Sequence, residues 1–143
     1  MYRALNRATV TTLGIIVVGA CLGMPAATAD NPVCTSTWCS FLLPSRNIGC
    51  ELNYQRGSGI TDEAYCQSDA PPRSVRMTPT GAFKTCDGES CLGNAGQGTP
   101  VLGYGQSAGV GPFTCRSDTN GVTCTVGSGR GFTLSNAGVT PVG

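Results

Sequence analysis

The clearest pattern in the chain is a strict alternation of apolar and polar positions over residues 113–126, interrupted by an Asp-Thr-Asn-Gly segment. Alternation with a period of two predicts two half-buried strands, and the Asp, Asn and Gly residues between them predict a hairpin turn. Placing Cys115 opposite Cys124 gathers the apolar residues of both strands on one face. A register centred on a two-residue Asn-Gly turn would instead place Cys115 opposite Val126, so we expect the Cys115–Cys124 pairing.

A second pair of alternating segments lies earlier in the chain, over residues 47–54 and 60–66. The polar residues of the first segment, including Glu51, fall on the face opposite the apolar ones, which predicts a half-buried strand. If the second segment returns antiparallel, Cys50 lies opposite Cys66, and we expect a disulfide between them. The expected inward positions are Ile48, Cys50, Leu52 and Tyr54 in the first segment, and Ile60, Ala64 and Cys66 in the second.

The remaining signals are shorter and contain no convincing helical periodicity. Tandem prolines at 71–72 end the second segment, and residues 74–78 are expected to form a short edge strand. Further strands are expected at 101–106 and 131–135, with glycine-rich loops around them and a tight turn over 85–91. The predicted fold class is therefore mainly β: a small antiparallel domain stapled by disulfides, with long Gly- and Pro-rich loops.

The first 29 residues have the organisation of a secretory signal peptide. Arg3 and Arg7 precede an uncharged stretch over residues 10–22, and Ala27-Thr28-Ala29 supplies the small residues that a signal peptidase recognises. Cleavage is expected between Ala29 and Asp30, which predicts a secreted protein. The stretch is shorter than the roughly 20 apolar residues of a membrane span, and no later segment is a candidate, so we expect no transmembrane span in the mature chain.

Two alternatives to free secretion remain open at this stage. The small residues before Cys21 resemble a bacterial lipoprotein signal, in which Cys21 would be lipidated and anchor the protein. An uncleaved N-terminal anchor is the third possibility. Beyond the signal we expect a lead-in with a small disulfide loop over residues 30–40, a disulfide-rich β domain over 41–135 and a flexible tail over 136–143.

The cysteines predict that disulfides stabilise this domain. Nine are present, and eight remain after the signal segment, an even number that predicts a disulfide framework in an exported chain. Zinc thiolates and thioredoxin-type redox chemistry are disfavoured, because the chain has no histidine and no Cys-x-x-Cys pair. The expected bridges are Cys34–Cys39, Cys50–Cys66, Cys86–Cys91 and Cys115–Cys124.

Composition excludes several classes of function. The absence of histidine excludes Ser-His-Asp triads and Cys-His dyads. A formal net charge of +1 gives no reason to expect the basic surface that binds nucleic acid. Asp87 and Glu89 lack the spacing of an EF-hand and are expected in a solvated turn. Glu51 and Glu63 could approach each other like the carboxylates of a glycosidase, but on an exposed sheet face we expect ordinary solvated acids. We expect neither a metal nor a cofactor.

Aromatic residues are the best candidates for ligand contacts. Trp38 is expected in the core, with an exposed anchoring role as the alternative. The tyrosines Tyr54, Tyr65 and Tyr104 lie in or beside the predicted loops and strands, where they are available as contacts. We therefore expect these four aromatic side chains to include the binding residues.

Three stretches of the chain carry a distinctive set of motifs: Phe41-x-x-Pro44-Ser45-x-Asn47-Ile48-Gly49-Cys50, then Val101-Leu102-x-Tyr104-Gly105, then Phe113-x-Cys115-x-Ser117 with Gly121-Val122-Thr123-Cys124 and Gly131-Phe132-x-Leu134-Ser135. Together they resemble a family of small exported actinobacterial disulfide-rich proteins known only as a domain of unknown function. The resemblance implies six framework cysteines, to which Cys34 and Cys39 are an addition, and it implies no activity. Arg130 stands where that family often has a histidine, so no role of that histidine transfers to this chain.

Taken together, these features predict an exported, non-catalytic binding protein, or one associated with the cell envelope, with an unidentified extracellular partner. Disulfide density, export and loops carried on a rigid scaffold are typical of recognition modules. A structural or accessory component of the cell wall is the first alternative. A small secreted hydrolase that uses acidic residues is the second.

Overall fold

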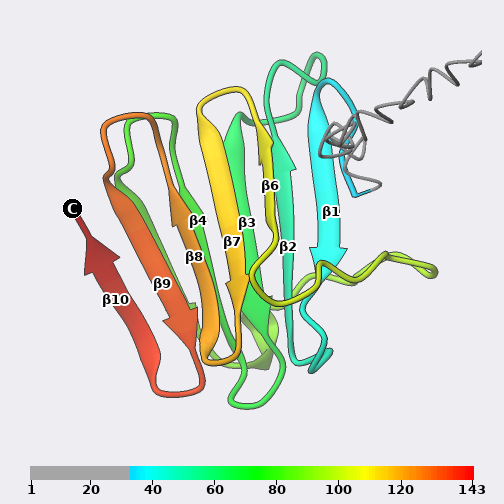
Figure 1. Ribbon diagram of the computed structural model, residues 1–143, viewed down its shortest axis with the longest axis vertical. Helices are drawn as coiled ribbons and strands as arrows, with labels where there is room; N and C mark the ends of the chain where they lie inside the picture. The colour runs from blue at the N-terminus through cyan, green and yellow to red at the C-terminus, as the bar shows by residue number, and fades with distance from the viewer. Residues whose placement is uncertain (1–32) are drawn as a thin grey trace, which may run out of the picture.

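The computed structural model describes residues 33–143, which form two antiparallel sheets packed face to face (Figure 1). Each sheet is a five-stranded meander in which consecutive strands are neighbours. The first sheet contains β1 (Trp38–Leu42), β2 (Ile48–Asn53), β3 (Glu63–Ser68), β4 (Arg73–Met77) and β5 (Phe83–Asp87). The second contains β6 (Ser107–Val110), β7 (Phe113–Asp118), β8 (Gly121–Thr125), β9 (Gly131–Ser135) and β10 (Gly138–Val142). The predicted mainly β, antiparallel class is confirmed.

The two alternating sequence patterns give the predicted registers. Cys115 pairs with Cys124 and Asp118 with Gly121, so the hairpin has the register in which all the apolar residues share a face. Cys50 pairs with Cys66 across β2 and β3. The expected strand over residues 131–135 is β9, in which Phe132 and Leu134 are fully buried.

The core lies between the two sheets and is built from their inward-facing positions. The second sheet places β6 against β1 and β2, and β9 against β3. The ring centroids of Phe83 and Phe132, one from each sheet, lie 5.7 Å apart. The largest fully buried side chains include Phe41, Leu52, Met77 and Val75 from the first sheet and Phe113, Phe132, Leu134 and Val122 from the second.

The structure corrects three expectations in the first sheet. The segment expected as an edge strand is β4, which lies between β3 and β5, because β5 adds a further strand that the sequence pattern did not predict. The expected tight turn over 85–91 is therefore half strand, and only a short 3-10 helix, Glu89–Cys91, follows it. Ile60 lies outside β3 and is 43% exposed, so it does not face the core.

Two further expectations, for residues 101–106 and for residues 136–143, are wrong. Residues 101–106 do not form a strand: Val101 makes one isolated parallel bridge with Leu42, and β6 begins after this segment. The expected flexible tail over 136–143 contains β10, which pairs with β9 along its whole length. β10 is an edge strand, so Pro141, which has no N–H group, is tolerated there.

Four disulfides are present in the part of the chain that the structure describes, and they are the four expected pairs. Cys50–Cys66 and Cys115–Cys124 each join two neighbouring strands, and their cysteines are buried. Cys34–Cys39 closes the small N-terminal loop, and Cys86–Cys91 joins β5 to the 3-10 helix at the surface. Each sheet thus has one buried disulfide that joins two of its neighbouring strands.

The expectations about export fall outside residues 33–143. The signal segment 1–29, cleavage after Ala29 and lipidation of Cys21 all concern residues that the structure does not describe. Among the described residues, no helix has the length and apolar character needed to cross a membrane.

Candidate functional site

A cleft lies on the outer face of the first sheet, on the side away from the second sheet. We call it the outer-face cleft; its floor comes from β1 to β4 and its cover from the loop segment 93–99. Its volume is about 230 Å³, below the roughly 300–1,000 Å³ of pockets for drug-sized ligands. Polar side chains that line it include Asn47, Glu51, Asn53, Glu63, Tyr65, Gln67, Asp69, Arg76 and Asn94.

The alternation of the strands explains why so many polar groups meet there. In β2 and β3, Cys50, Leu52, Ala64 and Cys66 are buried between the sheets, so the residues between them point outward. The registers place Glu51 opposite Tyr65 and Asn53 opposite Glu63. The outward face of this hairpin therefore has a continuous row of hydrogen-bonding side chains.

The Tyr65 hydroxyl and the Gln67 side chain fasten segment 93–99 to the sheet. The Tyr65 hydroxyl oxygen lies 2.7 Å from Gln67 Oε1 and 3.0 Å from the Cys91 carbonyl oxygen, the two acceptors for its proton. The Gly93 N–H donates to the Tyr65 hydroxyl at 3.0 Å and to Gln67 Oε1 at 2.7 Å. The far end of the segment is held by the Leu42 N–H, which donates to the Pro100 carbonyl at 2.9 Å. The cover of the cleft is thus anchored at both ends.

At one end of this face, Glu51, Asn53 and Arg56 form a closed polar network. Asn53 Nδ2 donates to Glu51 Oε1 at 2.8 Å, and Arg56 donates to Asn53 Oδ1 at 2.9 Å and to Glu51 Oε1 at 3.3 Å. The Arg56 guanidinium also lies over the Trp38 ring, 4.6 Å from its centroid. Asn53 is buried in this network, although its place in the alternation predicts exposure.

Arg76 makes the matching arrangement on the other side of the cleft. Its guanidinium pairs with Glu63 and lies 4.6 Å from the centroid of the Tyr65 ring. The two acids that the sequence pattern placed on one face do line the same cleft, but each is engaged with a different arginine. Glu51 and Glu63 are therefore each paired with an arginine, whereas Asp69 and Arg46, which also line the cleft, have no ion pair among the described residues.

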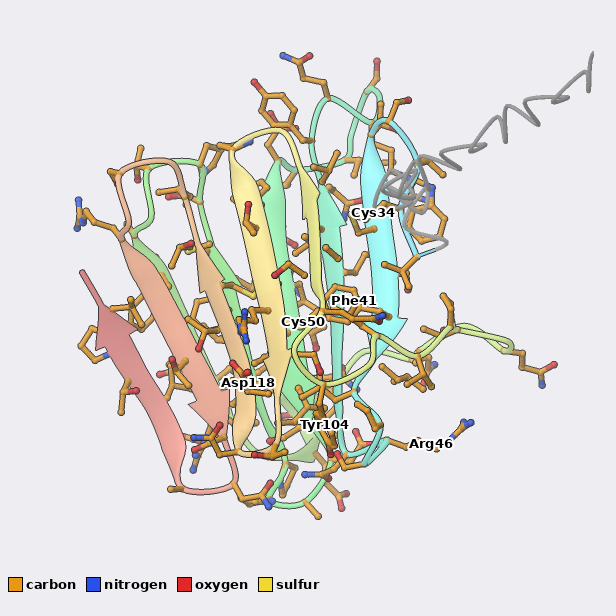
Figure 2. The ribbon with its side chains drawn as sticks, viewed as in Figure 1. Cys34, Phe41, Arg46, Cys50, Tyr104 and Asp118 are labelled. Carbon is orange, nitrogen blue, oxygen red and sulfur yellow. A yellow bond between two sulfur atoms is a disulfide. The ribbon has the colours of Figure 1, made fainter. Side chains whose placement is uncertain are left out.

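The four aromatic candidates do not form one site. Tyr65 lines the outer-face cleft, and Trp38 is half-buried on the same outer face, not in the core as expected. Tyr54 packs beside the core, so close to Gly111 that a Cβ there would lie 2.2 Å from Tyr54 Cδ1. Tyr104 is 44% exposed in the segment after Val101, where it lies near the lower end of the sandwich in Figure 2.

The other charged residues named from the sequence, Asp87, Glu89 and Arg130, lie outside the cleft, whereas Arg46 lines it. Asp87 accepts from Arg73 Nε at 2.6 Å, and Glu89 begins the surface 3-10 helix. Arg130 is exposed in the turn before β9. Arg46, at the mouth of the cleft, points away from the body of the sandwich in Figure 2.

Sequence reasoning did not identify Gln67, Arg76 and segment 93–99 as parts of a site. Gln67 and Arg76 occupy outward positions whose partners depend on strand register, and the register of β3 with β4 was not predicted. The path of segment 93–99 across the sheet has no signal in periodicity. The one available signal was the excess of polar residues on the outward side of the residue 47–54 pattern.

Comparison with protein-family models, with curated proteins and with solved structures finds no match for this chain.

Proposed function

We propose that the protein is an exported, non-catalytic binding module that takes an uncharged polar ligand in the outer-face cleft. The observation that carries this proposal is the pairing of charges around the cleft: Glu51 with Arg56, and Glu63 with Arg76. A charged ligand would have to break one of these ion pairs in order to use Glu51 or Glu63. The amides and hydroxyls of the cleft favour a ligand rich in hydroxyl or amide groups.

The size and construction of the cleft support the same proposal. A volume of about 230 Å³ suits a single sugar ring or a short peptide unit better than a drug-sized molecule. Segment 93–99 is anchored at both ends, so the cover is in place before a ligand arrives. Preorganisation of this kind lowers the entropic cost of binding.

Catalysis by acidic residues is disfavoured by the partners of the two glutamates. A glycosidase needs one carboxyl group that keeps its proton and one free carboxylate beside the scissile bond. Here neither carboxylate is free, because each accepts a hydrogen bond from an arginine.

Export is part of the proposal. The signal organisation of residues 1–29 motivates it, and four disulfides are compatible with a compartment outside the reducing cytosol. Free secretion after cleavage at Ala29 is the form that we propose, with a lipid anchor at Cys21 as the alternative. Intact-mass analysis of the exported protein separates the two, because only the second adds a lipid and retains residues 21–29.

The binding proposal is tested by amide chemical shifts during titration with neutral N-acetylated and non-acetylated oligosaccharides and with blocked dipeptides. We expect shifts confined to the cleft residues, and we expect Ala95→Trp to abolish them by filling the cleft. Thr119→Trp, a matched change at an exposed turn residue outside the cleft, should bind as the unaltered protein does. Shifts centred elsewhere, or equal binding by both variants, would contradict the proposal.

Envelope association is examined separately by fractionation. A binding module released into the medium should be recovered there in soluble form. A structural or accessory component of the cell wall should instead remain with the envelope after the cleft is blocked by Ala95→Trp. Retention in the envelope by both forms of the protein would favour that alternative.

A further inference from the structure

The two central disulfides lie against each other across the sandwich. Cys50–Cys66 joins β2 to β3 in the first sheet, and Cys115–Cys124 joins β7 to β8 in the second. Cys66 Sγ lies 3.6 Å from Cys124 Sγ, and the sulfurs of Cys50, Cys66 and Cys124 all lie within 4.8 Å of one another. Figure 2 shows Cys50 near the middle of the sandwich.

We propose that these four cysteines form a thiol-exchange relay, in which thiolation of Cys50 by a low-molecular-weight thiol creates a Cys66–Cys124 bridge between the sheets. Disulfide exchange needs a thiolate close to a disulfide sulfur, and a sulfur contact of 3.6 Å supplies that proximity without any large movement of the chain. The relay makes Cys50 a modification site and Cys115 the thiol that is released.

The relay has two steps, and neither consumes an oxidant. In the first, the external thiolate attacks Cys50 Sγ; the bond from Cys50 to Cys66 breaks, a mixed disulfide forms at Cys50, and Cys66 leaves as a thiolate. In the second, the Cys66 thiolate attacks Cys124 Sγ; the bond from Cys115 to Cys124 breaks, and Cys115 leaves as a thiolate. One thiolate enters and one is released, so electrons and charge balance.

Burial determines where the relay starts. Cys50 is 5% exposed, whereas Cys66, Cys115 and Cys124 are fully buried. An external thiol therefore reaches Cys50 first, and its attack there makes Cys66 the leaving group. Cys66 is also the member of that bridge whose contact with Cys124 is 3.6 Å. The more accessible cysteine and the exchanging cysteine of the first bridge are thus different residues, as a relay requires.

The test is to treat the oxidised protein with reduced glutathione without denaturant, quench with iodoacetamide and map tryptic peptides. Cleavage after the arginines and Lys84 places Cys50 in residues 47–56, Cys66 in 57–73, Cys115 in 85–116 together with Cys86 and Cys91, and Cys124 in 117–130. We expect glutathione on 47–56, an alkyl group on Cys115 and a disulfide between 57–73 and 117–130. Recovery of alkylated Cys66 together with an intact Cys115–Cys124 disulfide would overturn the relay, because the second step would not have occurred. A sample in which the surface Cys86–Cys91 disulfide has opened but none of these four cysteines has reacted would also overturn it.

A pair of double variants tests the exchange step alone. Cys50→Ala with Cys115→Ala leaves Cys66 and Cys124, and we expect oxidised glutathione to join them at least tenfold faster than the pair left by the control. The control, Cys50→Ala with Cys124→Ala, leaves Cys66 and Cys115, and Cys115 is not among the three sulfurs that lie within 4.8 Å of one another. Equal rates would overturn the proposal. If either variant does not fold, the peptide map of the unaltered protein decides the question.

Discussion

The guanidinium carbon of Arg76 lies 4.6 Å from the centroid of the Tyr65 ring. The ring and the hydroxyl of Tyr65 therefore have separate roles. The ring packs with a cation that is already paired with Glu63, and the hydroxyl contacts Cys91 and Gly93 at the start of the cover segment. One side chain thus links the charge pairs of the cleft floor to its cover.

The first prediction separates those two roles. Tyr65→Phe keeps the ring beside Arg76 but removes the hydroxyl that accepts from the Gly93 N–H. We expect a loss of about 1–2 kcal/mol in the free energy of unfolding, because part-buried groups lose hydrogen-bond partners. Hydrogen exchange should become faster over residues 93–96, while urea denaturation gives the stability. Tyr104→Phe, at an exposed tyrosine, should change neither, and unchanged exchange in Tyr65→Phe would show that the hydroxyl does not hold the cover.

The second prediction concerns Gly131, which begins β9. A Cβ at this position would lie 1.9 Å from the Cys124 carbonyl oxygen in the neighbouring strand β8, so Gly131→Ala forces the two strands apart. We expect a loss of about 3 kcal/mol or more, measured by thermal and urea unfolding. Gly127→Ala is the matched control, because a Cβ there meets no atom within 4 Å, and it should stay within about 0.5 kcal/mol of the unaltered protein. Similar stabilities for the two variants would contradict this account of the motif glycine.

The third prediction concerns Asn47, which connects the loop after β3 to the turn between β9 and β10. Its Nδ2 donates to the Ala70 carbonyl at 3.0 Å and to Asn136 Oδ1 at 3.1 Å, and its Oδ1 accepts from the Ala70 N–H at 2.8 Å. Asn47→Ala should cost about 2 kcal/mol, and Asn136→Ala, which removes one of these bonds, about 1 kcal/mol or less. Chemical denaturation of both variants measures the difference. A larger loss for Asn136→Ala would contradict the assignment of Asn47 as the centre of this network.

The fourth prediction ranks two of the disulfides. Replacing Cys115 and Cys124 together with alanine should cost about 3–5 kcal/mol, because the bridge closes the longer loop and its sulfurs fill space in the core. Replacing Cys86 and Cys91 should cost about 2 kcal/mol, because the loop is shorter and Cys86 is exposed. Calorimetric unfolding of the two double variants gives the order. An equal or greater loss for the surface pair would contradict it.

Strands were predictable from the sequence where one face of the strand is buried and the other face is exposed to solvent. The hairpin of β7 and β8 meets that condition, and the requirement that Cys115 face Cys124 was enough to choose its register. β1 does not meet it, because Trp38 and Leu42 are apolar residues on the outward face. β5 fails for the opposite reason: every residue of the strand except the half-buried Phe83 is exposed, so no alternation is visible.

The candidate site was predictable only in part, because some of its residues are placed by local alternation and others by strand register or by the path of a loop. The common face of Glu51 and Glu63 follows from local alternation. Their arginine partners depend on a turn conformation for Arg56 and on the register of β4 for Arg76, and neither is visible in a single segment. The cover depends on how a glycine-rich loop crosses a sheet, which hydrogen bonds of Tyr65 and Gln67 decide after the sheet has formed.

The single bridge between Leu42 and Val101 has a consequence for how copies of this protein meet one another. The Leu42 N–H donates to Pro100 and the Leu42 carbonyl accepts from Leu102, so the chain itself occupies part of the outer edge of β1. At the far end of the second sheet, Pro141 interrupts the row of donors on β10. Unpaired strand edges can form backbone hydrogen bonds with an edge strand of another molecule, which joins the two sheets into one. Because backbone pairing is obstructed at the outer edges of β1 and β10, we expect that high protein concentration does not cause polymerisation through these two edges.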